Sequence, residues 1–379
     1  MNKLKTAIIH EWLVNYAGSE RVVESFTNIW PEADVFALVD FLSDEQREII
    51  LKGRKANTSF IQKLPFAKTK HRNYLPLFPS AIERLDLSGY DIIISSSHAV
   101  AKGFKKKGNQ LHITYCHSPM RYAWDQSEHY LKGFKGLIAK IFINYLRKWD
   151  LKSAANVDFF IANSHHIAEK IERIYKREAA VIYPPVDTDK FGIGKRKEDY
   201  YVAASRMVPY KKLDLVVKAF NQMPDKKLVV IGSGPGKEKL RSIAASNIEV
   251  IGHLSREALK SFMQKAKAFV FAAEEDFGIV VVEAMACGTP VIALNKGGAK
   301  ESVINGITGL LFDEQSSESI NNAVIQFEKQ KDSFDPLTII KHSEEFSRNI
   351  FEEIIKNFVN EKVENFFLIN NKKNFKVRE

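Results

Sequence analysis

The sequence predicts an α/β protein made of two doubly wound domains with parallel sheets. The chain has 379 residues, more than one hydrophobic core usually organises, so two domains of roughly 150 to 200 residues are expected. Apolar runs of strand length alternate with segments of helical periodicity along almost the whole chain, as in domains built on parallel sheets. Two such domains would face each other across a cleft.

Short apolar runs mark the first domain, with strands expected at residues 6–9, 91–95, 111–115 and 159–162. The loop after the first strand carries Gly18 and Ser19, and the helix after it has Val22 and Phe26 on one face. A glycine-containing loop that leads into a helix N-terminus can bind an anion.

Consecutive prolines at positions 184 and 185 predict the domain boundary, because they remove backbone donors and force an extended chain. We therefore expect one domain at residues 1–183 and a second at 184–345. The second should contain five strands, at residues 200–204, 227–231, 248–251, 268–271 and 290–293. Residues 346–379 predict a helix that returns to the first domain and then a basic tail.

Composition limits the kinds of partner. There are 56 Lys and Arg against 46 Asp and Glu, a balance that suits nucleotides, nucleic acid or acidic lipid. No nucleic-acid-binding signature is present, so nucleic acid is not expected. Two distant cysteines, Cys116 and Cys287, argue against disulfides or zinc. Without a long apolar run or a secretory leader, a cytoplasmic location is expected.

Ligands of open parallel sheets bind outside the carboxyl ends of the strands. The loop after strand 200–204 carries Arg206 and Lys211. A guanidinium can donate hydrogen bonds to two phosphate oxygens at once, and an ammonium adds a mobile point charge. Gly232 follows the next strand in a Gly-Ser-Gly-Pro run that lacks the third glycine of a dinucleotide loop. Gly232 can serve a tight turn or contact a ligand.

The segment from Glu275 to Glu283 carries the most informative carboxylates. From Ile279 onward, Glu283 is the only polar side chain in an apolar helix, and a buried carboxylate costs several kcal/mol unless it is paired. Glu283 either pairs with a core arginine, has a capping role, or binds the hydroxyls of a ribose. Glu275 precedes the helix, where the backbone around Phe277, Gly278 and Ile279 would favour a phosphate or sugar oxygen.

This segment resembles the E-x7-E motif of glycosyltransferase family 4, whose members are retaining enzymes with the GT-B fold. Arg206 and Lys211 match the Arg-x4-Lys element of that family. Shorter matches cover residues 163–164, 185–191, 297–298, 301 and 306–312. The resemblance covers nearly the whole chain, with the acceptor side in the first domain and the donor side in the second.

The resemblance implies a role for each matched residue. Glu283 would bind the nucleotide ribose and Glu275 the transferred sugar, while Arg206 and Lys211 would stabilise the departing diphosphate. The reacting sugar would become oxocarbenium-like. Attack would come from the same face, with the leaving phosphate assisting deprotonation of the acceptor. The nucleotide-sugar is a substrate, and no cofactor is implied.

Three further residues are assigned by the resemblance. Gly18 and Ser19 stand where the family has paired glycines beside the phosphates, and the serine is a departure from that pattern. His117 follows strand 111–115, where related enzymes carry a histidine near the reacting sugar; a lone histidine there is also often structural. Residues 187–189 have the form D-x-D, but they lie in the interdomain stretch of a family that is typically metal-independent, so no metal is expected.

Residues 95–103, 117–124 and 205–212 resemble mannosyltransferases of bacterial polysaccharide and O-antigen assembly. GDP-mannose is thus the expected donor, with a UDP-sugar as the alternative, and a lipid-linked oligosaccharide or other glycolipid the expected acceptor. Residues 60–79 and 131–149 mix basic and aromatic side chains. They could lie at the acidic inner face of the cytoplasmic membrane, or be ordinary amphipathic helices with solvated basic faces.

Other functions on this fold stay open. A sugar-nucleotide epimerase would consume donor without an acceptor, and a phosphorylase would need a lysine-bound cofactor. A non-catalytic nucleotide-sugar binding protein would keep the fold without turnover. The set of Arg206, Lys211, Glu275 and Glu283 fits a glycosyltransferase better than these.

Overall fold

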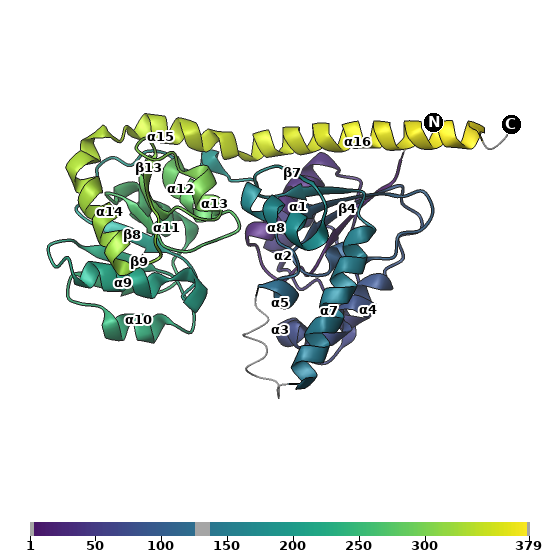
Figure 1. The fold of residues 1–379 in the computed structure, drawn as a ribbon, viewed down its shortest axis with the longest axis horizontal. Helices are drawn as coiled ribbons and strands as arrows, with labels where there is room; N and C mark the ends of the chain where they lie inside the picture. The colour runs from purple at the N-terminus through teal and green to yellow at the C-terminus, as the bar shows by residue number, and fades with distance from the viewer. Residues whose placement is uncertain (1–3, 126–136, 377–379) are drawn as a thin grey trace. The chain divides into compact units, whose positions relative to one another are not determined.

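The computed structural model describes residues 4–125 and 137–376. The chain divides into two compact units, which we call unit 1 (residues 1–185 and 351–379) and unit 2 (residues 186–350). Each unit has its own parallel sheet with helices, so the predicted class of two doubly wound α/β domains is confirmed (Figure 1).

Within its described residues, unit 1 has seven strands in the order β3-β2-β1-β4-β5-β6-β7, and each neighbouring pair is parallel. The strands are β1 (Thr6–His10), β2 (Asp34–Ala37), β3 (Asn57–Thr58), β4 (Ile92–Ser97), β5 (Leu111–Cys116), β6 (Phe159–Ala162) and β7 (Ala179–Val181). The chain moves outward in both directions from β1 and β4. The space beside their carboxyl ends is therefore the topological switch point of this sheet.

Two apolar clusters cover the two faces of the unit 1 sheet. Ile8 and Ile9 of β1 point to opposite faces, and Ile8 packs with Phe26 of α1, whereas Ile9 packs with Phe78 of α4 and Leu146 of α7. The helices of this unit are α1 (Gly18–Ile29), α2 (Asp44–Leu51), α3 (Ala67–Lys70), α4 (Phe78–Glu83), α5 (Arg121–Trp124), α7 (Leu137–Ala155) and α8 (His165–Tyr175), with 3-10 turns η1 (Phe60–Lys63), η2 (His71–Leu77) and η3 (Ala101–Gly103).

Unit 2 has six strands among its described residues, in the order β10-β9-β8-β11-β12-β13, again parallel. They are β8 (Tyr201–Ala204), β9 (Leu228–Ile231), β10 (Ile248–Ile251), β11 (Phe269–Phe271), β12 (Val291–Leu294) and β13 (Gly309–Phe312). The prediction of five strands was wrong by one, because β13 adds an edge strand beside β12. The switch point of this sheet lies between β8 and β11.

Helices connect the strands of unit 2, as expected for parallel neighbours. They are α9 (Leu213–Asn221), α10 (Lys237–Ile243), α11 (Arg256–Lys265), α12 (Ile279–Ala286), α13 (Gly298–Ser302), α14 (Ser317–Gln330) and α15 (Pro336–Ser343), with 3-10 turns η4 (Thr188–Lys190), η5 (Pro209–Lys211), η6 (Lys331–Ser333) and η7 (Glu344–Phe346). α12 is buried on most sides, as its apolar sequence predicts.

The last helix, α16 (Arg348–Lys376), begins in unit 2 and belongs to unit 1 from Phe351 onward. Phe351, Ile355 and Val359 are four residues apart, so they form one stripe, and all three are buried in the cluster that contains Phe26. The helix continues to Lys376, into the part of the chain for which the sequence predicted a basic tail.

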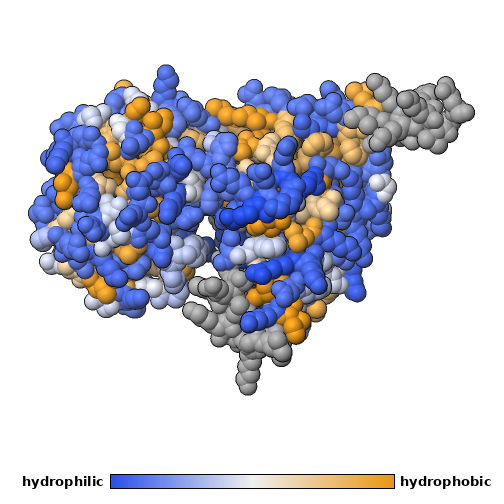
Figure 2. All heavy atoms as spheres, in the orientation of Figure 1, coloured by the Kyte–Doolittle hydropathy of each residue, from blue (hydrophilic) through white to orange (hydrophobic). Residues whose placement is uncertain are grey.

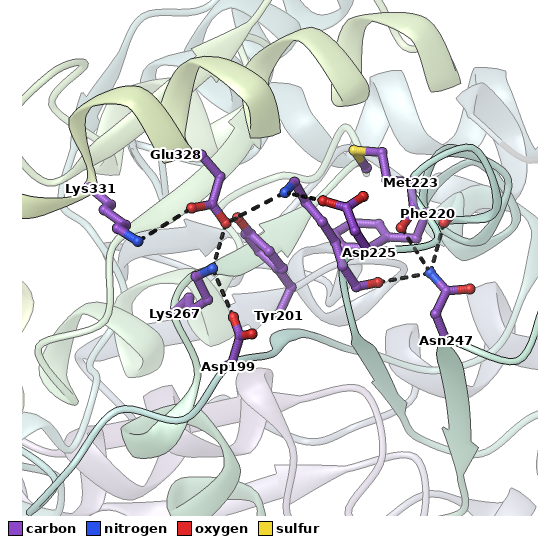
Figure 3. Close-up of polar contacts among 10 residues, drawn as sticks. Asp199, Tyr201, Phe220, Met223, Asp225, Asn247, Lys267, Glu328 and Lys331 are labelled. Carbon is purple, nitrogen blue, oxygen red and sulfur yellow. Dashed lines mark hydrogen bonds and ion pairs between the residues drawn. The ribbon is translucent and has the colours of Figure 1, made fainter.

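A polar cluster ties together the amino ends of the unit 2 strands (Figure 3). The carboxylate of Glu328 on α14 accepts hydrogen bonds from the Tyr201 hydroxyl at 2.6 Å and from the Lys267 ammonium at 2.5 Å. Burial would raise the pKa of Glu328, but these two partners outweigh burial and lower it. The polar groups at this edge bind one another, whereas the loops at the opposite, carboxyl edge carry the residues predicted for ligand binding.

Two surface segments of unit 1 are more buried than the sequence suggested. In residues 60–79, His71, Leu75 and Phe78 are core residues, as is Trp149 of α7. Exposed apolar side chains remain at Phe60, Phe66, Leu77, Ile141, Tyr145 and Leu151. The predicted second segment began at residue 131, and residues 131–136 lie outside the described residues. Within the described ranges, no helix is both long and apolar enough to span a membrane.

Candidate functional site

The switch point of unit 2 brings two predicted residues into contact. Lys211 lies at the end of the turn after β8, and Glu275 lies in the loop between β11 and α12. They are 64 positions apart in the sequence, yet the Lys211 ammonium donates to the Glu275 Oε1 atom. Their side chains are 12% and 20% exposed, so the ion pair remains accessible to a ligand.

Arg206 joins the same loop through an aromatic residue. Its Nη2 atom donates to the hydroxyl of Tyr210. The guanidinium of Arg206 and the ammonium of Lys211 lie 5.9 Å and 5.4 Å from the centroid of the Tyr210 ring, within the range of cation–π attraction. Tyr210 was not predicted as a site residue; an aromatic residue between two cations on one loop is the signal that could have identified it.

The loop that carries Glu275 is shaped by its neighbour after β12. The backbone N–H of Gly298 donates to the Glu275 carbonyl at 2.8 Å, and a Cβ at position 298 would overlap the Cα of Phe277. Phe277 is buried, with its ring 5.7 Å from that of Phe346. Gly278 then caps α12, whose first residue is Ile279. The N-terminal amides of this helix favour an anion nearby.

Gly232 has a structural reason to be glycine. It follows β9 with a φ of +150°, and a Cβ there would overlap the carbonyl oxygen of Ser205. The turn after β9 therefore packs directly against the start of the loop that carries Arg206. This close approach accounts for the residue without a ligand, and it fixes where that loop begins.

Glu283 meets a cation in the structure. It is buried on α12, and its Oε1 atom lies 3.7 Å from Nη2 of Arg256, the first residue of α11. The same Nη2 atom lies 2.9 Å from Asp187, which Arg348 also contacts at 2.7 Å. Burial would raise the pKa of Asp187, but Arg348 and Arg256 hold it well below its usual value. No sequence spacing links Arg256 to Glu283, so this partner was not predictable from the sequence.

In unit 1, the predicted anion-binding loop already contains a carboxylate. Gly18 is the first residue of α1 and Ser19 the second. The Oε2 atom of Glu20 accepts hydrogen bonds from the backbone N–H of Ala17 at 3.2 Å and from the Ser19 hydroxyl at 3.0 Å. Glu20 therefore supplies a negative charge to this helix N-terminus from within the protein.

His117 is the first residue after β5 and is buried. Its Nε2 atom lies 2.8 Å from the Ser96 hydroxyl, and Asn163 donates to its carbonyl at 3.2 Å. Burial, and then the nearby His98 and His10, hold the pKa of His117 well below its usual value. The imidazole is therefore neutral at pH 7 and exchanges hydrogen bonds without carrying charge.

Four residues that were not predicted from the sequence are linked to His117 through successive contacts, and together the five form what we call the histidine–glutamate cluster: His10, Glu11, Glu20, His98 and His117. His10 lies 3.6 Å from Glu20 and 3.8 Å from Glu11. Glu11 lies 3.1 Å from His98, whose ring centroid is 6.2 Å from that of His117. His10 ends β1, Glu11 follows it, and His98 follows the neighbouring β4, so the rule that ligands bind at strand ends could have selected them as it selected Arg206.

Comparison with known families identifies the chain. The sequence profile described as "Glycosyltransferase Family 4" matches residues 16–190, and the profile described as "Glycosyl transferases group 1" matches residues 185–352. The chain belongs to these glycosyltransferase families. The resemblance predicted from the motifs is confirmed.

Several curated relatives of this glycosyltransferase align over part of their length. An uncharacterized glycosyltransferase of Methanocaldococcus jannaschii is 31% identical over 204 residues, which are 52% of this chain and 56% of that protein. A GDP-mannose-dependent alpha-(1-6)-phosphatidylinositol monomannoside mannosyltransferase of Mycolicibacterium smegmatis is 33% identical over 173 residues, 37% of this chain and 44% of that protein. The glycosyltransferase thus spans about half the length of these relatives.

Solved structures share the fold of the glycosyltransferase over almost its whole length. HepE of Anabaena in complex with UDP and glucose has a TM-score of 0.69 and 17% identity, and the match covers 94% of this chain and 100% of that one. Sucrose-phosphate synthase of Thermosynechococcus elongatus has a TM-score of 0.72 and 18% identity, over 95% and 99% of the two chains. The GT-B fold is confirmed.

Mutual contacts shift the pKa values of His10, Glu11 and Glu20 in the histidine–glutamate cluster of the glycosyltransferase. Burial would lower the pKa of His10, but Glu20 and Glu11 outweigh burial and raise it. Burial would raise the pKa of Glu11, but His98, His10 and the backbone of Ala99 hold it well below its usual value. The pKa of Glu20 is lowered by His10 against the effect of burial. Ionised carboxylates thus flank His10 at the switch point of unit 1.

Proposed function

We propose that the chain is a retaining glycosyltransferase that binds a nucleotide-sugar donor with unit 2. The observation that carries the proposal is the contact of Lys211 with Glu275 at the switch point of the unit 2 sheet, with Arg206 held beside them by Tyr210. Two cations and one carboxylate on neighbouring loops suit a ligand that has a diphosphate at one end and sugar hydroxyls at the other.

In this proposal each charged group acts on a different part of the donor. Arg206 and Lys211 stabilise the negative charge that develops on the leaving diphosphate, which is the largest electrostatic contribution available at the site. Glu275 accepts hydrogen bonds from the transferred sugar, and Lys211 orients its carboxylate. Glu283 accepts from the ribose, with Arg256 as its partner from the protein.

The transfer itself breaks the bond between the anomeric carbon and the phosphate oxygen, and the sugar becomes oxocarbenium-like. The acceptor hydroxyl attacks from the same face, so the configuration is retained. Its proton passes to the leaving phosphate oxygen, which needs no second carboxylate as nucleophile. His117 is neutral and offers hydrogen bonds to a hydroxyl rather than charge.

Mannose from GDP-mannose is the proposed transferred group, and a lipid-linked oligosaccharide of a surface polysaccharide such as O-antigen is the proposed acceptor. Relatives with 33% and 34% identity are described as GDP-mannose-dependent mannosyltransferases that act on phosphatidylinositol mannosides. A UDP-sugar is the second candidate, because HepE, which shares the fold, was solved with UDP-glucose.

A donor screen tests the proposal. The full-length chain is incubated with GDP-mannose and with a set of UDP-sugars, with and without a lipid-linked oligosaccharide extract, and released nucleoside diphosphate is measured. We expect release from GDP-mannose that depends on the extract. Release only from a UDP-sugar would replace the donor, conversion of the donor without an acceptor would indicate an epimerase, and no turnover would indicate a binding protein.

We also propose that transfer needs no metal ion. The first aspartate of the Asp187-Thr188-Asp189 triplet forms ion pairs with Arg256, Arg348 and Lys190. The negative charge that develops on the leaving phosphate would be stabilised by Arg206 and Lys211 in place of a metal ion. Nucleoside diphosphate release should therefore persist at an undiminished rate after dialysis against EDTA. Complete loss in EDTA, restored by manganese, would contradict this proposal.

Unit 1 is proposed to bind the acidic inner face of the cytoplasmic membrane. Phe66 is 74% exposed, and Ile141 and Tyr145 on α7 are 62% and 49% exposed. Exposed basic residues accompany them at Lys63, Lys68, Lys70, Arg72, Lys140 and Lys148. Figure 2 shows apolar surface interleaved with hydrophilic surface over unit 1 around α7. Such a surface gains apolar burial and about 1 kcal/mol per basic residue near anionic lipid.

Vesicle flotation tests the membrane surface. The chain should float with vesicles that contain acidic lipid, and less so at high salt, because salt screens the exposed charges. Replacing Lys63, Lys68 and Lys70 by glutamate should abolish flotation, whereas Lys331→Glu in unit 2 should not change it. If the unmodified chain stays unbound with acidic vesicles, the proposal is wrong.

A further inference from the structure

A glutamate and a histidine of unit 1 face each other at the carboxyl ends of β1 and β4. Glu11 is fully buried, and its Oε2 atom lies 3.1 Å from Nδ1 of His98. The two residues are 87 positions apart and meet because their strands are parallel neighbours. They lie at the topological switch point of the unit 1 sheet, where open parallel sheets bind their ligands.

The other carboxylate oxygen of Glu11 is fixed by the loop after β4. Its Oε1 atom accepts hydrogen bonds from the backbone N–H groups of His98 at 2.9 Å, Ala99 at 2.7 Å and Ala101 at 3.2 Å, and from the Ser97 hydroxyl at 3.2 Å. The carboxylate cannot rotate without losing these donors. Oε2 is therefore held toward the His98 ring.

The carboxylate determines which nitrogen of His98 carries the proton. An ionised carboxylate only accepts hydrogen bonds, so the nitrogen that faces it has to be protonated. Nδ1 of His98 is the nitrogen nearest the carboxylate, 3.1 Å from Oε2, and it is buried with no other hydrogen-bond partner among the described residues, while the side chain as a whole is 18% exposed. In neutral imidazole, Nε2 is then the unprotonated acceptor. Within the described part of the chain, no protein group bonds to Nε2.

The neighbours of His98 restrict its ring. The ring of Trp12 meets it edge-on, with the centroids 4.8 Å apart, and the ring of His117 also lies edge-on to it, with the centroids 6.2 Å apart. A ring that is fixed in place and presents one lone pair matches a ligand group that donates one hydrogen bond. Saccharide hydroxyls are such groups.

We infer that His98 is an acceptor-binding residue whose Nε2 atom receives a hydrogen bond from a saccharide hydroxyl, and that Glu11 is the residue that positions it. The inference deepens the proposed function and rests on it, because a glycosyl acceptor supplies the hydroxyl. Neither residue belongs to the donor-binding set of unit 2. The effect of changing His98 should therefore appear in acceptor kinetics and leave donor kinetics unchanged.

Nitrogen-15 NMR of the histidine rings tests the geometry directly. The full-length chain is labelled at histidine, and the His98 signals are assigned by their loss in His98→Gln. We expect the tautomer with the proton on Nδ1. A proton on Nε2 overturns the inference whatever the kinetics show.

Two substitutions test the role in acceptor binding, with the lipid-linked oligosaccharide extract of the donor screen as the probe. His98→Asn keeps an amide that can face Glu11 but removes the outward acceptor, so KM for the extract should rise about tenfold, the effect of one lost hydrogen bond. KM for the donor and the melting temperature should stay unchanged. The longer side chain in His98→Gln places a carbonyl oxygen further out, so KM for the extract should rise less than in His98→Asn.

The matched control is His253→Asn, at an exposed histidine of unit 2, which should leave KM for the extract as it is. An unchanged KM in His98→Asn overturns the inference while leaving the proposed function intact. If the unmodified chain releases no nucleoside diphosphate from any donor, the proposed function fails, and the inferred role in acceptor binding fails with it, even with the expected NMR tautomer.

Discussion

Alanine in place of Arg206 is expected to lower kcat about 100- to 1,000-fold, the usual effect of removing one group that stabilises a developing anion. The guanidinium lies on the loop after β8 and is held by the Tyr210 hydroxyl rather than by a carboxylate, so its charge is available to a diphosphate. Arg206→Lys should retain part of the rate, because an ammonium supplies charge without the two-pronged geometry. Steady-state release of nucleoside diphosphate measures both variants.

Glu275→Gln is the companion to this substitution. The substitution removes the negative charge of Glu275 and with it the ion pair to Lys211. Both loops of the site are then affected, so kcat should fall by a factor similar to that for Arg206→Ala. Arg241→Ala is the matched control, since Arg241 lies in the same unit but on the exposed surface of α10, paired with Glu238. Unchanged rates in Arg206→Ala and Glu275→Gln would show that the donor site has been assigned to the wrong residues.

The fold was predictable where strands are central and apolar. Strands such as β5 and β9 are runs of buried residues between helical segments, and the sequence shows them directly. β3 consists of Asn57 and Thr58 alone, and β2 begins with the exposed Asp34. These segments become strands only because a neighbour pairs with them, which is a tertiary effect that local propensity does not contain.

The dependence on strand pairing also explains why some residues of the candidate sites could not be predicted from the sequence. Lys211 and Glu275 each follow a strand of unit 2, so the rule that ligands bind at strand ends selected both before their contact was known. His10 ends the first strand and Glu11 follows it, but which residues they contact depends on the register of that strand. The pairing of β1 with β4 sets His10 beside Ser96 and brings Glu11 to Ser97 and the loop that follows it. No local pattern encodes that register.

Asparagine in place of Asp150 should destabilise unit 1 by about 3 to 5 kcal/mol, because it leaves a buried lysine without its counter-charge. Asp150 on α7 is fully buried and forms an ion pair with Lys102, which is 1% exposed. Its second oxygen accepts from the Trp124 indole N–H and the Tyr175 hydroxyl, each at 2.8 Å. Asparagine can still accept hydrogen bonds from these two donors, so the loss of stability measures the effect of removing the negative charge.

Tryptophan fluorescence during urea unfolding is the appropriate measurement, because all four tryptophans, Trp12, Trp30, Trp124 and Trp149, belong to unit 1. The control is Asp86→Asn, which removes an exposed carboxylate paired with Lys107 on the surface of the same unit and should leave the midpoint almost unchanged. Because Trp124 contacts Asp150, the substitution can change the fluorescence intensity itself. The comparison therefore uses the midpoint of the urea unfolding curve and not its amplitude.

A double variant separates the cost of the unpaired charge from the worth of the pair. Lys102→Met together with Asp150→Asn removes both charges, and a buried pair replaced by neutral side chains of similar size is often no less stable than the original. The double variant should therefore be more stable than Asp150→Asn alone. If it is less stable, the ammonium of Lys102 contributes through its approach to the Tyr175 ring, 5.2 Å from the centroid, and not only through Asp150.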